Sequence, residues 1–326
     1  MGFRNVPHTV VLNDRNLAQN AIYARMASVG YSLLLVLTAF IWGSGFVAQI
    51  EGNAFGPFAF SCIRCFIAAG FLAFVFKILD VLGKSPRRPR NRNEMILHWK
   101  AGFFCGLALC TAMNLQQLGM YLGTSAGKSG FLTACYIVLV PVVSLFLGKR
   151  VSIKTWICVA ITTVGLYLLC IKDGFSLELS DGVSLLCALA FSIHILVIDK
   201  FVNHIDPIRV SSIQFLTIGV LTAPLMIVFD LKFPAMDFST VITAFANPRA
   251  VAGLLFAALC SSGIAYTLQI VAQDKVRPTI ASLTMSLESV FAVFAGWAVL
   301  GEQLSARELI GCAIMMVAIV TAQIKR

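Results

Sequence analysis

The sequence predicts an all-α polytopic membrane protein with ten transmembrane helices arranged as two inverted five-helix repeats. Composition is the first reason: of 326 residues, 59% are hydrophobic and 12% are charged, whereas soluble domains carry about 25% charged residues. So much apolar surface requires lipid around it. The second reason is a series of apolar runs that are each long enough to cross a bilayer. The third is that the second half of the chain repeats the first.

The repeat is clearest in two similar segments that each follow a long apolar run, Leu147–Ser152 and Leu300–Ser305. A constant shift of 153 positions superposes them and continues through the apolar run that follows. Nearer the start of each half, a shift of 150 places Pro57 on Pro207. A single match among apolar residues is weak evidence, but matches in the same order along both halves indicate a duplication.

A helix needs about 20 apolar residues to span a bilayer, and ten segments qualify. Most connections are short, which predicts antiparallel neighbours, and only 81–97 and 230–249 are longer. We therefore divide the chain into a tail at 1–29, a first repeat at 30–171, a linker at 172–180 and a second repeat at 181–324. The predicted helices are 30–50, 57–80, 98–119, 125–147, 153–171, 181–200, 208–229, 250–272, 278–300 and 305–324.

The basic residues predict the orientation. If the N-terminus lies inside, most of the 25 Lys and Arg residues fall on the inner side, and the outer side has only Lys128, Lys172, Lys232, Arg249 and Arg307. Cytoplasmic loops are enriched in Lys and Arg. This predicts a multi-pass protein of the bacterial cytoplasmic (plasma) membrane with both termini in the cytoplasm. The net charge of +10 is explained by these loops, so nucleic acid is not an expected partner.

Five helices per half is an odd number, so the second half must enter the membrane from the opposite side. Secondary transporters commonly build a binding site near the bilayer midplane between such inverted halves.

Several motifs resemble those of EamA-type proteins in the drug/metabolite transporter superfamily. Ile41–Ala48 is similar to the opening segment of these proteins, and Thr124–Phe131 to the start of their fourth helix. Ser286–Phe291, followed by Gly296–Glu302, resembles the ninth-helix signature, and Arg64 fits the second helix. The resemblance covers about 30–324. It implies ten helices in two inverted repeats, and carriers of small metabolites that are often exporters.

Polar residues within the helices are the candidates for substrate binding, because polar groups in hydrocarbon usually face a protein interior or a wet cavity. In the eighth helix, Ser262, Tyr266, Gln269 and Gln273 lie on one helical face. Such stripes either line a cavity or bond helices together. The substrate-binding candidates are Trp42, Arg64, Asn114, Gln117, Lys128, Tyr136, Gln214, Tyr266, Gln269, Ser286 and Glu288.

Two of these candidates carry a positive charge. Arg64 offers a guanidinium that binds a carboxylate or phosphate through two parallel hydrogen bonds; alternatively it reaches the interface or pairs with backbone carbonyls. The equivalent residue in the second repeat is the uncharged Gln214. The charge is therefore not required in both halves, which favours a functional role for Arg64. Lys128 begins the fourth helix near the outer surface, where it either extends to water or contacts substrate.

Glu288 and His194 are the candidates for proton coupling. Glu288 lies near the middle of the ninth helix, too deep for its side chain to reach water. Hydrocarbon disfavours its charged form, which suits proton coupling or pairing with a substrate amine. The alternative is helix packing on a face shared with Ala281 and Ala292. His194 either relays protons or, as we favour, satisfies a neighbour's hydrogen bond.

These observations favour a secondary transporter that exports small polar metabolites, foremost amino acids or related compounds, by alternating access at a central cavity. Its expected partners are a small-molecule substrate and the lipid bilayer; monomer and homodimer both remain open. The alternatives are a membrane-embedded enzyme acting on a lipid-linked substrate and a non-transporting scaffold or receptor. An enzyme is not favoured, because phosphate-loop and HExxH motifs are missing. No cofactor or metal is expected, since the four His are scattered.

Overall fold

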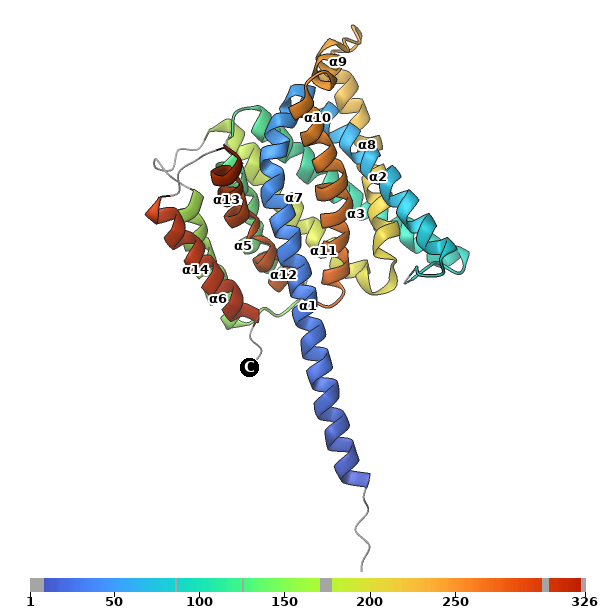
Figure 1. Ribbon diagram of the computed structural model, residues 1–326, viewed down its shortest axis with the longest axis vertical. Helices are drawn as coiled ribbons and strands as arrows, with labels where there is room; N and C mark the ends of the chain where they lie inside the picture. The colour runs from blue at the N-terminus through green and yellow to red at the C-terminus, as the bar shows by residue number, and fades with distance from the viewer. Residues whose placement is uncertain (1–8, 86, 125, 171–177, 301–304, 324–326) are drawn as a thin grey trace, which may run out of the picture.

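The computed structural model describes residues 9–85, 87–124, 126–170, 178–300 and 305–323. Within these ranges the chain forms helices joined by turns and no strands (Figure 1). Nine of the helical segments described are long and apolar enough to cross a membrane, and Ile153–Leu169 is a shorter apolar helix. The prediction of an all-α polytopic membrane protein is confirmed, and these segments together agree with ten spans.

The first half contains the helices α1 to α6. Helix α1 begins well before the apolar run predicted at 30–50, because hydropathy marks the part of a helix inside lipid and not where the helix starts. Helix α3 also begins earlier than predicted, since the side chain of Asn91 caps it by accepting a hydrogen bond from the Glu94 amide. The elements are α1 (Thr9–Gly52), η1 (Asn53–Phe55), α2 (Pro57–Val81), α3 (Arg92–Tyr121), α4 (Ala126–Ala134), α5 (Tyr136–Phe146) and α6 (Ile153–Cys170).

The second half contains α7 to α14. The segment 230–249, predicted as a loop, includes the short helix α9, and a π-helical segment, η4, separates two α-helical parts of the eighth predicted helix. Such π-helical turns are frequent at functional sites. The elements are α7 (Leu179–Phe201), η2 (Val202–His204), α8 (Pro207–Leu225), η3 (Met226–Asp230), α9 (Ser239–Phe245), α10 (Pro248–Leu255), η4 (Phe256–Ala265), α11 (Tyr266–Gln273), α12 (Pro278–Met285), α13 (Glu288–Leu300) and α14 (Ala306–Gln323).

The fourth and ninth predicted helices are both interrupted in their middle. Cys135 separates α4 from α5, and residues 286–287 separate α12 from α13. At both places some backbone amides bond to the carbonyl three residues back instead of four, which tightens the turn. As a result Tyr136 is the first residue of α5 and Glu288 is the first residue of α13.

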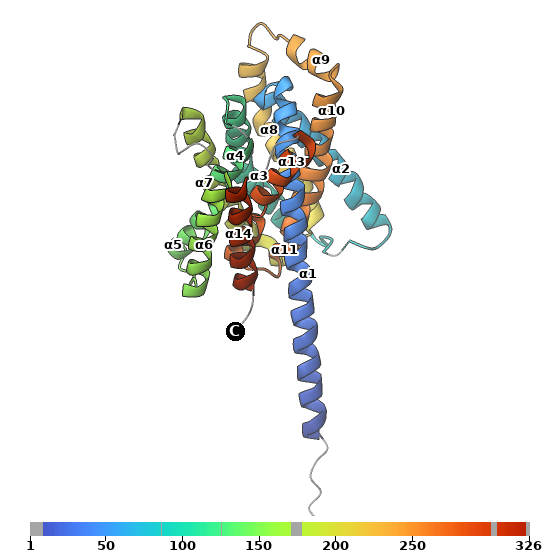
Figure 2. The same ribbon diagram turned by 60° about the vertical axis from the view of Figure 1, so that its left-hand side comes forward.

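The helix neighbours are those of an inverted duplication. Helix α2 packs beside α8, α6 beside α14, and the α4–α5 pair beside α12 and α13, so these elements contact their own counterparts. Helix α3 packs on α7, and α10, η4 and α11 pack on α1 in the equivalent way. Figures 1 and 2 show the resulting bundle, in which α1 begins and α14 ends on the same side. We term this the termini side and the opposite one the far side.

Two acidic residues at equivalent positions hold α2 and α8 together at opposite ends. Asp80 and Asp230 are related by the same shift of 150 that aligns the starts of the two helices. The Asp230 carboxylate accepts hydrogen bonds of 2.6 and 2.8 Å from backbone amides in the first turn of α2. The Asp80 carboxylate accepts hydrogen bonds of 2.7 and 3.0 Å from Arg209, in the first turn of α8. The acidic residue at the end of each helix is therefore bonded to the first turn of the equivalent helix in the other half.

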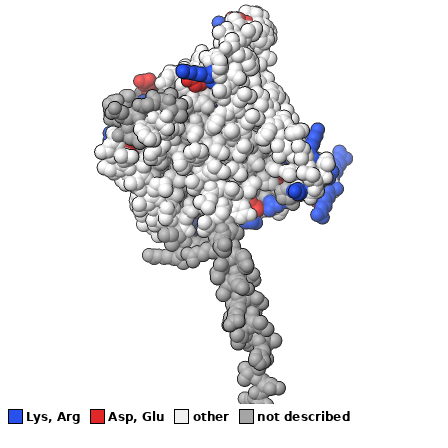
Figure 3. All heavy atoms as spheres, viewed as in Figure 1, with Lys and Arg blue, Asp and Glu red and all other residues white. Residues whose placement is uncertain are grey.

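The surface is that of a multi-pass membrane protein. Most of the face drawn in Figure 3 is neither basic nor acidic. Basic residues gather at the lower right of that view, over the connection between α2 and α3. Large apolar side chains on the helix surfaces, such as Phe74, Phe146 and Val317, are exposed, as expected where lipid replaces water.

Candidate functional site

A small cavity lies between the two halves, near the interruptions of the fourth and ninth helices. Its volume is about 30 Å³, which is room for about two water molecules and not for a metabolite. The lining residues are Trp42, Phe46, Gln49, Arg64, Gln116, Thr133, Tyr136, Phe191, Ser261, Tyr266 and Glu288.

Arg64 is the only cation among the described residues of this lining, and 2% of it is exposed. Its Nη1 donates a long hydrogen bond of 3.4 Å to Oε1 of Gln49, and its Cζ lies 5.4 Å from the centre of the Phe60 ring. Among the described residues, its Nε has no hydrogen-bond partner and no carboxylate forms an ion pair with it. A buried charge without an opposite charge costs several kcal/mol, so this position favours an anionic ligand.

Glu288 supplies the carboxyl group of the cavity. Its Oε1 accepts a hydrogen bond of 3.0 Å from the hydroxyl of Tyr136. The side chain is 4% exposed. The cavity thus holds a guanidinium and a carboxyl group that are each available to a ligand with the opposite charge.

Aromatic rings form one wall. The rings of Trp42 and Tyr266 lie with centroids 4.6 Å apart, and Phe215 and His194 pack against Tyr266 at 5.6 and 5.9 Å. Trp42 Nε1 has no hydrogen-bond partner within the described part of the chain. Such a wall offers apolar faces to the carbon skeleton of a ligand and one donor to a polar group on it.

Hydrogen-bonded amides close the cavity toward the far side. The side chain of Gln117 donates to the backbone carbonyl of Gln49 at 3.2 Å and to the side chain of Asn53 at 2.7 Å. Together with the contact between Gln49 and Arg64, these bonds join α1, α2 and α3.

A counterpart of this network lies toward the termini side. His194 on α7 contacts Oε1 of Gln214 on α8 at 3.3 Å, just as Gln49 on α1 contacts Arg64 on α2. Gln269 donates to Gln273 at 3.0 Å, and Gln273 donates to a backbone carbonyl of α7 at 3.0 Å. Equivalent helices are therefore joined on the two sides of the cavity.

Comparison with known proteins shows which family the sequence matches. The model of the EamA-like transporter family matches twice, over residues 30–171 and 180–322. The chain belongs to the EamA-like transporter family. An uncharacterised transporter of Archaeoglobus fulgidus is 29% identical over 293 residues, which cover 89% of this chain and 85% of the relative. The transporter YoaV of Bacillus subtilis, also uncharacterised, is 25% identical over 289 residues, 86% and 92% of the two chains.

A solved crystal structure has the same fold. It superposes with a TM-score of 0.69 at 15% sequence identity and covers 90% of this chain and 96% of its own. The predicted resemblance to EamA-type proteins is confirmed, and the transporter class follows for this chain at the level of the family.

The EamA-like fold brings together five of the predicted site residues: Trp42, Arg64, Tyr136, Tyr266 and Glu288 all line the cavity. Gln117, Gln214, Gln269 and His194 belong to the networks on either side of it. The sequence left open whether the polar residues of the eighth helix line a cavity or bond helices together, and both roles occur. Tyr266 lines the cavity, and Gln273 bonds α11 to α7.

Three further candidates form other contacts. Asn114 donates to Thr222 on α8 at 2.8 Å, and the Ser286 hydroxyl donates to the Leu283 carbonyl at 2.8 Å. Lys128 Nζ lies 2.6 Å from the carboxylate of Asp181 at the start of α7. Lys128 is thus part of a bond between the halves on the far side and not part of the cavity lining.

Six lining residues were not among the candidates: Phe46, Gln49, Gln116, Thr133, Phe191 and Ser261. Gln116 donates to Thr133 at 3.0 Å. The repeat offered a signal for it, since the shift of 153 places Gln116 on Gln269, which was a candidate. Ser261 lies in the π-helical segment η4, whose altered spacing no sequence periodicity indicates.

Ion pairs join the two halves on the termini side. Arg87 binds both oxygens of Asp274 at 2.9 and 3.2 Å, and Lys149 pairs with Asp199. Burial raises the pKa of Asp274, but hydrogen bonds from Arg87 and Lys275 outweigh it and hold the pKa of this carboxyl below its usual range. The pair between Arg87 and Asp274 therefore stays charged at neutral pH.

Proposed function

We propose that this EamA-like protein is a secondary transporter that exports small polar metabolites by alternating access at the central cavity. Zwitterions such as amino acids and related compounds fit the cavity best. We place the protein in a bacterial cytoplasmic membrane with both termini in the cytoplasm, because the basic residues favour the termini side. The substrate then enters from the termini side and leaves on the far side.

One observation carries this proposal: Arg64 and Glu288 line the same closed cavity, and no carboxylate among the described residues pairs with Arg64. A ligand with a carboxylate would satisfy the guanidinium through a bidentate contact, and its ammonium would replace the Tyr136 hydroxyl at Glu288. A zwitterion satisfies both groups at once. An anion or a cation alone would leave one of them without an opposite charge.

Alternating access is supported by the equivalent contacts on the two sides of the cavity. Opening toward the far side would break contacts between the halves such as that of Lys128 with Asp181. Opening toward the termini side would break those of Arg87 with Asp274 and of Lys149 with Asp199. Because the halves are inverted copies, rocking one half against the other exchanges the two states around a common site.

Glu288 is the group that would couple transport to protons. Its carboxyl group lies in the cavity where a substrate amine would bind, so a proton and an ammonium would compete for it. Proton entry from one side and substrate entry from the other would then load the same position alternately.

Counterflow in proteoliposomes tests the proposal. Purified protein is reconstituted into vesicles loaded with unlabelled amino acids, and uptake of the labelled compound is measured. We expect saturable counterflow for a subset of zwitterions, and little for matched compounds that lack either the amine or the carboxylate. Arg64→Lys should weaken the apparent affinity by about ten- to a hundredfold, because a point charge does not replace the bidentate fork. Equal counterflow of zwitterions and their singly charged analogues would overturn the assignment.

A further inference from the structure

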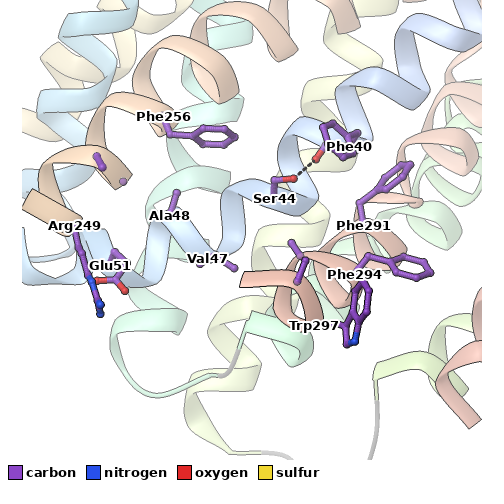
Figure 4. Close-up of a pocket in the computed structure, with 14 residues that line it drawn as sticks. Phe40, Ser44, Val47, Ala48, Glu51, Arg249, Phe256, Phe291, Phe294 and Trp297 are labelled. Atoms are coloured by element: carbon purple, nitrogen blue, oxygen red, sulfur yellow. Dashed lines mark hydrogen bonds between the residues drawn. The ribbon is translucent and has the colours of Figure 1, made fainter. Parts of the chain in front are cut away.

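A second and larger hollow lies on the lateral surface of the bundle, outside the central cavity. It is an open groove of about 850 Å³ between α1, α13 and the segment formed by α10 and η4. Figure 4 shows its labelled side chains. The lining residues are Phe40, Ser44, Val47, Ala48, Glu51, Arg249, Ala252, Gly253, Phe256, Phe291, Phe294, Ala295, Trp297 and Ala298. We refer to it as the lateral groove.

The lateral groove is separate from the central cavity because two close helix contacts seal its floor. A Cβ atom on Gly253 would lie 2.5 Å from the backbone oxygen of Ala48, so α10 and α1 touch through their backbones there. A Cβ atom on Gly43 would lie 2.5 Å from the backbone oxygen of Glu288, so α1 and α13 touch in the same way. Small residues allow such close approach of helices in membranes.

The length of the lateral groove matches one leaflet of a bilayer. Along α1 it runs from Phe40 to Glu51, eleven residues apart, which is about 16 Å of helix. Half of the hydrocarbon thickness of a bilayer is about 15 Å. Glu51 and Trp297 lie toward the far-side ends of their helices, and tryptophan is typical of the membrane interface. The groove thus extends from the far-side interface to the middle of the membrane.

The polarity of the lateral groove changes from its deep end to its far-side end. Its deep part is formed by apolar side chains, including Phe40, Phe256 and Phe291, and the hydroxyl of Ser44 is already bonded to the Phe40 carbonyl at 2.9 Å. The charged residues of the lining are Glu51 and Arg249, which lie side by side at the end toward the far side (Figure 4). A carboxylate and a guanidinium side by side complement a headgroup with an ammonium and a phosphate.

We propose that the lateral groove binds a zwitterionic, amine-headed phospholipid of the far-side leaflet. One acyl chain lies along the groove, Arg249 binds the phosphate and Glu51 binds the ammonium. The phenylalanines at the deep end contact the end of the acyl chain. Because α1 and α13 also carry Trp42 and Glu288 of the central cavity, a lipid in this groove contacts the two helices on which the site depends. The proposal does not rest on transport activity.

Lipid titration of the full-length protein in mild detergent tests this site. Native mass spectrometry measures the apparent affinity for phosphatidylethanolamine, phosphatidylglycerol and diacylglycerol with identical acyl chains. We expect phosphatidylethanolamine to bind about tenfold more tightly than the other two, because it alone satisfies both charges. Arg249→Gln and Glu51→Gln should each abolish this preference. Lys232→Gln, which removes an exposed cation of the same side outside the lateral groove, should leave it unchanged.

A steric variant tests the acyl-chain position. Ala252 lines the groove with an exposed side chain, so Ala252→Trp should fill the groove, leave the melting temperature of the lipid-free protein close to that of the parent, and reduce binding of all three lipids. Equal affinity for the three lipids in the parent, or a preference that survives Arg249→Gln, would overturn the proposal. So would a dimer that Ala252→Trp converts to a monomer, because the lateral groove would then be an interface between copies of the chain.

Discussion

The hydroxyl of Tyr136 donates a hydrogen bond of 3.0 Å to the carboxylate of Glu288 across the boundary between the two halves. Each residue is the first of a helix that follows an interruption. The two positions differ by 152, one less than the shift that superposes the repeats. Two nearly equivalent residues of an inverted duplication therefore meet in the central cavity, and their chemistry differs: one is a hydroxyl donor and the other a carboxyl group.

Glu288→Gln should remove the pH dependence of transport. The amide keeps the shape and can still accept from Tyr136, but it neither titrates nor binds an ammonium as an ion pair. In the parent, raising the pH deprotonates Glu288 and strengthens substrate binding until the group is fully ionised. Proton movement and substrate uptake measured together in liposomes check this. An unchanged pH profile and proton flux in the variant would leave Glu288 as a packing residue.

Tyr136→Phe removes only the hydrogen bond to Glu288. The tyrosine hydroxyl stabilises the ionised carboxylate by donating to it, so the variant should move the pH midpoint of substrate binding upward without abolishing binding. Tyr167→Phe is the control, since that exposed tyrosine lies on α6 outside the cavity lining. A midpoint shifted downward, or shifted equally by both substitutions, would contradict the role of Tyr136.

The ion pair between Asp80 and Arg209 should help to keep the termini side closed. Arg209→Gln leaves Asp80 without its nearest cation, whereas Arg88→Gln removes a more exposed arginine that lies 3.9 Å from the same carboxylate. We expect Arg209→Gln to expose a cysteine at position 261, in the cavity, several-fold more to a thiol reagent added from the termini side. The same change with Arg88→Gln would argue for a general charge effect.

The pair between Arg87 and Asp274 should not respond to pH in the physiological range. The pKa of Asp274 lies below its usual range, so the stabilisation by this pair is complete above about pH 4 and is lost only as the pH falls through the lower folded-state pKa. Asp274→Asn should therefore weaken closure of the termini side equally at pH 6 and pH 8. Cysteine accessibility in the variant at both pH values checks this, and an effect confined to pH 8 would contradict it.

Helices α6 and α14 should tolerate no side chain at Gly311. A Cβ atom there would lie 2.6 Å from the backbone oxygen of Gly165 and 2.8 Å from the backbone nitrogen of Leu169. Gly311→Ala should lower the free energy of unfolding by about 1–3 kcal/mol through overpacking. Gly70→Ala, on α2 with no atom of the described residues within 4 Å of the added Cβ, is the matched control. Thermal unfolding in detergent compares the two, and equal melting temperatures would contradict the close contact.

The orientation is tested by labelling single cysteines from outside intact cells. Asp237→Cys on the far side should react with an impermeant reagent, and Arg88→Cys on the termini side should not. Arg88 is exposed and Asp237 is partly exposed, so burial alone would favour labelling at position 88, and preferential labelling at position 237 reports sidedness. External labelling at position 88 would reverse the proposed orientation and, with it, the direction of export.

The sequence determined the class, the repeat and the membrane character of this protein. Those properties depend on composition and on order along the chain: 12% charged residues, apolar runs of spanning length, and matches such as Pro57 with Pro207. The EamA-like family signature lies in short contiguous motifs for the same reason. Arg64 and Glu288 were identified because a charge within an apolar run is visible without a structure.

The tertiary structure decided which polar residues meet. Trp42, Arg64, Tyr136, Tyr266 and Glu288 come from separate spans, and only packing brings them to one cavity while Lys128 pairs with Asp181. The interruptions at 135 and 286–287 were not visible in the sequence, because neither contains a proline or a glycine and periodicity does not report which carbonyl an amide bonds. The lateral groove could not be predicted from the sequence either, because its shape depends on where α1, α10 and α13 separate. Neighbour relations between distant segments depend on three-dimensional packing, and a linear pattern does not contain them.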